Sequence, residues 1–350
     1  MKLLSFLFTI FFVLVLSTCH HKNSQFIPVL PLSISNNAVA MINTQKGFEI
    51  YSFNGLLTGK TWKDITNNGY RLSQGSWKSI SMPELSLPVL ASTAVNIGTD
   101  VYLIGGYTVN QKGEEKSVAD IFKLDTVKQE WSVVTKMPVP VDDTVALTYA
   151  NRYIYLISGW HDVDNVSIVQ VYDVKLNKWF TANPYPAPAV FGHAGGIVEN
   201  TLVICDGVKV VKHGKSKEFV ASPICQLGVI NPTHPEIIDW SDMPHHSQTA
   251  YYRMAATGDI ENSRFIFAGG SDNPYNYDGI GYNKVPSEAS NLVFEYDSNY
   301  NVWKTHSDII GSTMDHRALL TDGHWFYIVG GMKKQQKISN EIMKFTIDNE

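Results

Sequence analysis

The fold is decided by the stretch Arg264-Phe265-Ile266-Phe267-Ala268-Gly269-Gly270, a short apolar run that ends in a pair of glycines. A polar loop, 271–290, follows it. A second apolar run, Leu292-Val293-Phe294-Glu295-Tyr296-Asp297, comes next, and Trp303 stands six residues after its aspartate. Short β-rich runs bounded by glycine and polar residues predict strands. We therefore expect a strand, a turn, a long loop, a second strand, and a final strand that carries the tryptophan.

The same order recurs along the chain. The spacing Asp-x5-Trp occurs three times, with the tryptophans at Trp131, Trp179 and Trp303. A glycine closes an apolar run at six places, which are Gly55, Gly106, Gly159, Gly207, Gly270 and Gly331. A period of roughly 50 residues with four short strands in each unit is typical of a β-propeller. One such unit cannot bury both of its faces, so the six units are expected to stack in a ring.

These residues resemble the kelch repeat, in which a double glycine, a downstream tyrosine and a tryptophan mark each blade. The doublet is intact at Gly105-Gly106, Gly269-Gly270 and Gly330-Gly331. The first glycine is replaced in the other three units, by Asn54, Ser158 and Asp206. The resemblance covers about 26–348, nearly all of the expected mature chain, and implies an all-β fold. We expect a six-bladed propeller of four-stranded antiparallel blades over 26–350.

The N-terminus predicts export. Residues 1–18 consist of Lys2 and then an apolar run without charge, which is too short and too terminal for a membrane span and is typical of a signal peptide. Leu16-Ser17-Thr18-Cys19 resembles a bacterial lipobox, which implies lipidation of Cys19; the alternative is ordinary cleavage beside a chance cysteine. Residues 19–25 would form a tether. The predicted location is the bacterial periplasm or outer membrane, with a lipid anchor as the link to the membrane.

The first residues after the tether predict how the ring closes. Phe26-Ile27-Pro28-Val29-Leu30-Pro31 looks like the outermost strand of a blade, and the sixth unit lacks such a strand at its end. The N-terminal strand is therefore expected to complete the C-terminal blade, which would remove two exposed sheet edges.

Composition narrows the classes of function. The chain is 44% hydrophobic and 12% aromatic, has a formal net charge of −5, and contains no basic run, which argues against nucleic-acid binding. We expect a monomer. Cys205 ends one strand and Cys225 begins the next, so the two face each other either as a disulfide or as two buried thiols.

A column of polar residues is predicted at the mouth of the central channel. Aligning the innermost strands on their glycines gives Asn37, Ser92, Thr144, His193, Arg253 and Arg317. Two arginines and a histidine around one ring favour an anion, and a carboxylate in particular. The alternative is a water-filled channel lining in which the arginines form salt bridges to loop acids, among them Asp143, Asp315 and Glu288.

The longest loop predicts a second part of the site. Its segment 271–282 contains Tyr275, Tyr277 and Tyr282 among asparagine and aspartate, a combination that suits stacking and hydrogen bonding with a sugar. The alternative is an ordinary turn-rich loop. Trp160 leaves its blade at the same end of the propeller.

Two functions remain open. The first is a binding or scaffolding propeller that holds a protein or glycan on its loop face. The second is implied by a resemblance to periplasmic sialate mutarotases: Arg253 and Arg317 would hold the carboxylate of an acidic sugar. His193 and His316, with Glu288 behind them, would then move a proton between the ring oxygen and the anomeric hydroxyl of the sugar. We expect no cofactor or metal, because the sequence has no zinc, phosphate-loop or dinucleotide motif. It also lacks the cysteine–tyrosine ligand set of the galactose oxidases, another kelch-like group.

Overall fold

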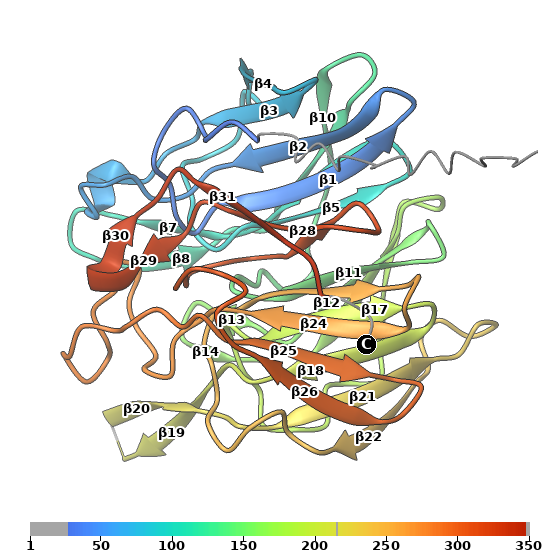
Figure 1. Cartoon of the computed structure of the whole chain (residues 1–350), viewed down its shortest axis with the longest axis vertical. Helices are drawn as coiled ribbons and strands as arrows, with labels where there is room; N and C mark the ends of the chain where they lie inside the picture. Colours follow the sequence, from blue (N-terminus) through green and yellow to red (C-terminus); the bar gives the residue numbers. More distant parts are fainter. Residues whose placement is uncertain (1–26, 215, 348–350) are drawn as a thin grey trace, which may run out of the picture.

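The computed structural model describes residues 27–214 and 216–347, which form six antiparallel sheets arranged in a ring (Figure 1). The innermost strands of neighbouring sheets touch in a closed circle, from β1 through β5, β11, β17 and β23 to β27 and back to β1. Five of the sheets have four strands and the sixth has three. The predicted six-bladed propeller is confirmed.

Blades 1 to 3 are regular sheets in which each strand pairs with the next one outward. Blade 1 contains β1 (Ala38–Thr44), β2 (Gly47–Phe53), β3 (Gly69–Ser73) and β4 (Ser76–Ile80). Blade 2 contains β5 (Thr93–Ile97), β6 (Asp100–Ile104), β9 (Asp120–Asp125) and β10 (Glu130–Lys136). Blade 3 contains β11 (Val145–Tyr149), β12 (Tyr153–Ile157), β15 (Val169–Asp173) and β16 (Lys178–Ala182).

Blades 4 and 5 repeat this pattern and blade 6 is shorter. Blade 4 contains β17 (Ala194–Val198), β18 (Thr201–Cys205), β21 (Cys225–Ile230) and β22 (Ile238–Met243). Blade 5 contains β23 (Ala255–Asp259), β24 (Arg264–Ala268), β25 (Val293–Asp297) and β26 (Val302–His306). Blade 6 contains β27 (Leu320–Thr321), β28 (Phe326–Val329) and β31 (Ile342–Phe345).

Short hairpins leave the ring after the second strand of four blades, and three of them lie toward the left in Figure 1. They are β7–β8 (Tyr107–Val109, Glu115–Ser117), β13–β14 (Trp160–His161, Asp164–Asn165), β19–β20 (Val208–His213, Ser216–Ala221) and β29–β30 (Met332–Lys333, Lys337–Ile338). The only helical segments among the described residues are the 3₁₀ turns η1 (Trp62–Asp64) and η2 (Lys334–Gln336). We call the side that carries these hairpins the loop face.

The double-glycine positions owe their composition to the backbone. The first position is left-handed in every blade, including Asn54, Ser158 and Asp206, with φ of 55°, 55° and 67°. Asparagine and aspartate tolerate this region better than most residues. The second position is always glycine because the chain passes close by: a Cβ on Gly106 would lie 2.6 Å from the carbonyl oxygen of Leu90. The first-position glycines are crowded as well, since a Cβ on Gly269 or Gly330 would lie 2.5 Å from a carbonyl oxygen.

The repeat tryptophans tie each blade to the one before it. In blades 1 to 5 the indole Nε1 donates a hydrogen bond to the outer strand of the preceding blade, or to the residues that follow it. The acceptors are Pro28 O for Trp77, Ser81 O for Trp131, Thr135 Oγ1 for Trp179, Asn183 O for Trp240 and Pro244 O for Trp303. A buried indole N–H seeks such a partner. The repeated tryptophan therefore fixes the angle between blades as well as filling space.

The N-terminal segment closes the ring against blade 6. Leu30 N donates to Asn340 O at 2.8 Å, and Ile34 N donates to Ser339 O at 3.0 Å. The Leu30 and Ile34 side chains are buried in a cluster shared by blades 1 and 6. The described part of the segment forms no regular strand, because Pro28 and Pro31 have no N–H to donate. The predicted closure is present, with irregular pairing in place of a full ladder.

The predicted export features fall outside this description. Residues 1–18, Cys19, the tether 19–25 and Phe26 are not among the described residues. Within 27–214 and 216–347, no helix has the length and apolar character needed to cross a bilayer.

Candidate functional site

A ring of left-handed residues surrounds the channel at the loop face. One such residue precedes the innermost strand of each blade, and the six are Asn36, Ala91, Asp143, Gly192, Arg253 and Asp315. At each position a backbone amide bonds to the preceding blade, as in Gly192 N to Asp143 O at 2.9 Å and Arg253 N to Gly192 O at 2.8 Å. In blade 6 the donor is His316 N. The circle of hydrogen bonds closes where Asn36 N donates to Asp315 O.

This ring corrects the predicted column in blades 5 and 6. Asn37, Ser92, Thr144 and His193 each follow a left-handed residue, and the equivalent residues are Met254 in blade 5 and His316 in blade 6. Arg253 is itself a left-handed residue, and Arg317 lies one residue past His316. A fixed count back from the glycine does not keep the register, because the turn between the first two strands varies from two residues in blade 2 (98–99) to four in blade 5 (260–263).

The two arginines of the predicted column converge on two aspartates. Arg253 Nη2 and Nε donate to Asp143, and its Nη1 lies 3.0 Å from Asp315 Oδ1. Arg317 Nη1 also donates to Asp143. Asn36 Nδ2 donates to Asp315 Oδ1 at 2.9 Å. We call these five residues the ion cluster; it joins blades 1, 3, 5 and 6 across the channel.

The ion cluster is buried and its charges balance. Arg253 and Asp143 are each 2% exposed, and Asp315 is fully buried. Burial alone would raise the pKa of Asp143, but the guanidinium groups of Arg253 and Arg317 outweigh it and lower that pKa to about 2. Two cations and two carboxylates therefore neutralise each other. This matches the alternative prediction, in which the arginines form salt bridges to the loop acids Asp143 and Asp315.

An aromatic pocket of about 220 Å³ opens on the loop face above the ion cluster. Its walls come from three hairpins, the loop before blade 4 and the long loop of blade 5. The aromatic lining residues are Tyr107, Trp160, Phe191, Phe219, Tyr277 and Tyr282. The rings support one another: Phe219 stacks on Tyr282 with centroids 4.2 Å apart, and Trp160 meets Phe191 at 5.4 Å. Such a preformed, mostly apolar concavity is typical of a binding site.

Three acids and one arginine complete the lining of the aromatic pocket. Asp142, Asp143 and Arg253 line it, and Glu115 on β8 contributes a more exposed carboxylate. Ser117 Oγ donates to Asp142 Oδ2 at 2.6 Å. The pocket is therefore apolar on its walls and carries mostly negative groups among its polar ones.

A second cavity of about 280 Å³ occupies the channel on the other side of the ion cluster. The innermost strands line it together with Arg317 and His193. His193 Nε2 bonds to Ile157 O at 2.8 Å, and burial lowers the pKa of His193 to about 4. Because Arg253 lines one cavity and Arg317 the other, the ion cluster lies between them.

The other predicted site residues lie in several places. Arg253, Trp160, Tyr277 and Tyr282 line the aromatic pocket, whereas Asn37 and Thr144 hydrogen-bond within their own blades. Tyr275 is fully buried, with its ring 5.0 Å from that of Tyr252. His316 Nε2 bonds to Thr313 Oγ1 at 2.8 Å, and burial lowers the pKa of His316 to about 3. Glu288 is exposed and lines neither cavity.

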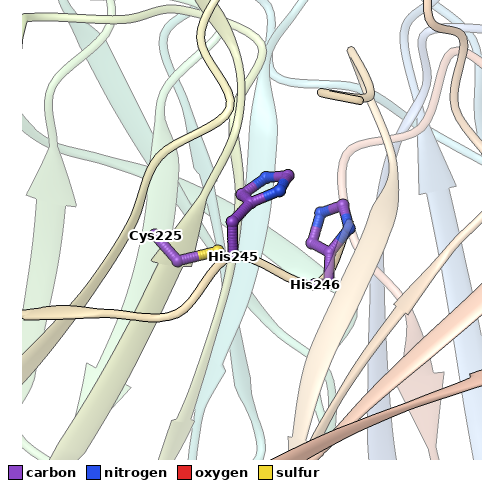
Figure 2. A group of neighbouring side chains, drawn as sticks. All are labelled: Cys225, His245 and His246. Atoms are coloured by element: carbon purple, nitrogen blue, oxygen red, sulfur yellow. The ribbon is translucent and has the colours of Figure 1, made fainter. Parts of the chain in front are cut away.

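A cysteine and two histidines meet at the end of blade 4, where β21 begins and β22 has ended (Figure 2). One ligand atom from each of Cys225, His245 and His246 lies within 4.8 Å of the others. All three are engaged: Cys225 forms a disulfide with Cys205, and the two histidine Nε2 atoms contact Asp206 at 2.6 and 2.7 Å. Their present bonds link the outer loop of blade 4 to its double-glycine turn, which is a structural role.

Several pocket residues were not singled out by the sequence. Phe191, Phe219, Glu115 and Asp142 lie in four separate segments, and no local motif joins them. The available signal was positional: Glu115 and Phe219 lie in the insertions between the second and third strands of their blades. Every such insertion ends at the loop face, so its aromatic and acidic residues were candidates.

Residues 89–138, which span blade 2, match the family model of the Kelch motif. This match and the glycine turns of the six blades support a kelch-type repeat. The chain has the fold of a kelch-type six-bladed β-propeller. Kelch propellers share the blade and vary in their loops, so the family accounts for the ring and leaves the aromatic pocket as a feature of this chain.

Known proteins similar to this kelch propeller match parts of it or its fold. Kelch-like protein 15 of Gallus gallus is 26% identical over 132 residues, 38% of this chain and 26% of that protein. A putative F-box/kelch-repeat protein of Arabidopsis thaliana is 30% identical over 88 residues, 25% of this chain and 23% of its own length. The matches thus span about a quarter of these relatives. The solved structure of YjhT superposes with a TM-score of 0.72 at 14% identity, covering 92% of this chain and 97% of YjhT.

Proposed function

We propose that this chain is a protein-binding propeller whose partner is anchored in the aromatic pocket of the loop face. The observation that carries the proposal is the pocket itself: six aromatic rings around about 220 Å³, above a charge-balanced ion cluster. Aromatic side chains in such hollows dominate the binding energy of protein interfaces. The rigid blades hold the loops in place, which lowers the entropy cost of binding.

The experiment is capture by chemical crosslinking with variants of the pocket. Trp160→Ala removes a half-buried aromatic side chain from the wall of the pocket. Truncation of such an interface hot spot weakens binding by roughly 2 kcal/mol or more, which is about 30-fold in affinity. The matched control is Tyr300→Ala, an aromatic residue that is 76% exposed and lies outside the pocket lining. A partner that crosslinks to wild type and Tyr300→Ala but not to Trp160→Ala supports the proposal. Equal capture by all three proteins overturns it.

The acidic-sugar alternative comes from the resemblance to sialate mutarotases and is favoured by the rings and the Asn276 amide in the pocket. It asks Arg253 and Arg317 to hold a substrate carboxylate. Both arginines already bind Asp143, so the substrate would have to replace that aspartate. The test follows the mutarotation of N-acetylneuraminate by NMR. Acceleration that Arg317→Lys abolishes would favour this alternative over the protein-binding function.

We propose the bacterial periplasm or outer membrane as the location, with Cys19 as the lipidated residue. Support comes from the apolar run in 1–18 and from the Cys205–Cys225 disulfide, which persists in oxidising compartments. The test is palmitate labelling of the wild type and of Cys19→Ser. Label and membrane association that both disappear in Cys19→Ser support the anchor. An unlabelled wild type contradicts it.

A further inference from the structure

We propose that the aromatic pocket takes a cationic group, the guanidinium of an arginine side chain presented by the partner. This inference rests on the proposed protein-binding function and names the chemistry that the pocket recognises. It departs from the anion that the arginine-containing sequence suggests, because the structure brings carboxylates to the same place.

Aromatic rings in the pocket and directly behind its walls already accept cations from the chain itself. The Arg253 guanidinium lies 4.7 Å from the ring centroid of Tyr252 and 5.5 Å from that of Tyr275. At the rim, Lys217 Nζ lies 5.4 Å from the ring centroid of Trp160. Cations are attracted to aromatic faces within about 6 Å, and the attraction grows when the site excludes water. The aromatic walls of the pocket therefore favour a cation over an anion of similar size.

Charge counting at the pocket points the same way. Its lining contains Glu115, Asp142 and Asp143 and one cation, Arg253, while Lys217 lies outside the lining against Trp160. Arg253 and Arg317 are balanced by Asp143 and Asp315, so the carboxyls of Glu115 and Asp142 remain without a cationic partner among the described residues. Desolvation raises the pKa of both carboxyls, against the lowering effect of the Arg253 guanidinium, and most for the buried Asp142. A bound cation would favour their charged forms.

An anion would meet the opposite situation. The guanidinium groups that would have to bind it are occupied by Asp143 and Asp315, which are 2% and 0% exposed. Releasing a buried aspartate from its arginine leaves an unpaired buried charge, which is strongly unfavourable. The anion would also face Glu115. The ion cluster thus closes the inner end of the pocket without net charge, and its arginines are not free to bind an anion.

The size of the pocket fits one side-chain head group. Sites for drug-sized ligands have volumes of roughly 300–1,000 Å³, and this pocket has about 220 Å³. The planar guanidinium suits it because arginine stacks on aromatic faces and donates in a fork to a carboxylate. Glu115 at the mouth is positioned to accept from such a fork.

The test is calorimetric titration with two matched probes, N-acetylarginine methylamide and N-acetylcitrulline methylamide. They share size and shape, and citrulline lacks the charge. We expect the arginine probe to bind at least about tenfold more tightly than the citrulline probe. Glu115→Gln should weaken the arginine probe several-fold. The adjacent exposed Glu114→Gln, whose carboxylate in wild type accepts from Asn110 Nδ2, should leave it unchanged.

The outcomes separate this inference from the proposed function. Equal binding of the two probes, with both dependent on Trp160, overturns the cation preference and keeps the pocket as a binding site. No binding of the arginine probe, while crosslinked capture still depends on Trp160, also overturns the cation inference alone. If wild type and Trp160→Ala capture the partner equally, the proposed function is overturned as well. A titration of N-acetylneuraminate that depends on Trp160 and exceeds the arginine probe in affinity would establish an anion site instead.

Discussion

The indole Nε1 of Trp77 donates a hydrogen bond to the carbonyl oxygen of Pro28 over 2.9 Å. In blades 2 to 5 the same nitrogen bonds to the outer edge of the preceding blade. Pro28 therefore stands where the outer strand of blade 6 ends. The start of the described chain thus supplies the outer edge of the last blade, and the ring is held shut by the same contact that spaces the others.

This closure predicts a difference between two leucines two residues apart. Leu30 is 1% exposed in the core shared by blades 1 and 6, whereas Leu32 is 39% exposed. Leu30→Ala should lower the free energy of unfolding by about 2–4 kcal/mol, because it leaves a cavity at the closure. Leu32→Ala should change it by less than about 0.5 kcal/mol. Urea unfolding of both variants measures this, and equal effects would place the closure elsewhere.

The ion cluster predicts a large cost for removing one arginine. Arg253→Met leaves Asp143 and Asp315 buried with one cation between them, which should cost roughly 3–5 kcal/mol. The matched control is Lys128→Met. It breaks an ion pair with Asp125 whose lysine is 68% exposed and should cost less than about 1 kcal/mol. If the two variants melt alike, the cluster does not hold the blades together.

Two buried histidines predict a loss of stability in mild acid. Burial lowers the pKa of His193 to about 4 and of His316 to about 3, so both are neutral in the folded protein at pH 7. The unfolded chain binds their protons near pH 6.5. The stability that the protein gains from keeping these two histidines neutral is therefore fully present above pH 6.5. It is lost as the pH falls from 6.5 toward 4 for His193 and toward 3 for His316.

The variant His193→Gln isolates one of these protons. Between about pH 6.5 and 4 the free energy of unfolding should depend less steeply on pH in this variant. The change in slope should correspond to close to one proton fewer taken up on unfolding. Denaturant unfolding at several pH values gives the slope. Comparison at pH 8, where the histidines are neutral in both states, separates the cost of repacking. An unchanged slope would mean that His193 is accessible to protons in the folded protein.

The disulfide predicts a defined pattern of alkylation. Cys205 and Cys225 are bonded and directly opposed in the register of β18 and β21. Peptides that contain them should take up no iodoacetamide from the denatured protein without reductant, and one adduct each after reduction. Closing a loop of 20 residues is worth about 3 kcal/mol, so reduction should also lower the melting temperature. Alkylation without reductant would show that the bond is absent in solution.

The sequence predicts the ring well because its signals are periodic. The glycines and the tryptophans occupy equivalent positions in successive blades. A regular interval in the sequence therefore corresponds to one step around the ring. Even the replaced glycines keep the rule, since Asn54 and Asp206 retain the left-handed backbone. The closure was predictable for the same reason, as blade 6 lacks an outer strand.

The site was less predictable because it depends on single-residue register and on loops. The turn between the first two strands varies in length from blade to blade, so the glycines do not fix the register of the column. In blade 5 the column position belongs to Met254, and Arg253 is a left-handed residue whose side chain reaches Asp143. The aromatic pocket draws on insertions of different length, and nothing in the sequence shows how far each one folds over the channel. Phe219 meets Tyr282 only through such folding.

The most direct test of the account is displacement of the crosslinkable partner by the two matched probes. Wild-type protein is loaded with its partner, and N-acetylarginine methylamide or N-acetylcitrulline methylamide is added at increasing concentration before crosslinking. If one aromatic pocket holds the partner through a cation, the arginine probe releases the partner and the citrulline probe does not. Retention of the partner at saturating arginine probe would contradict the account, as would equal release by both probes.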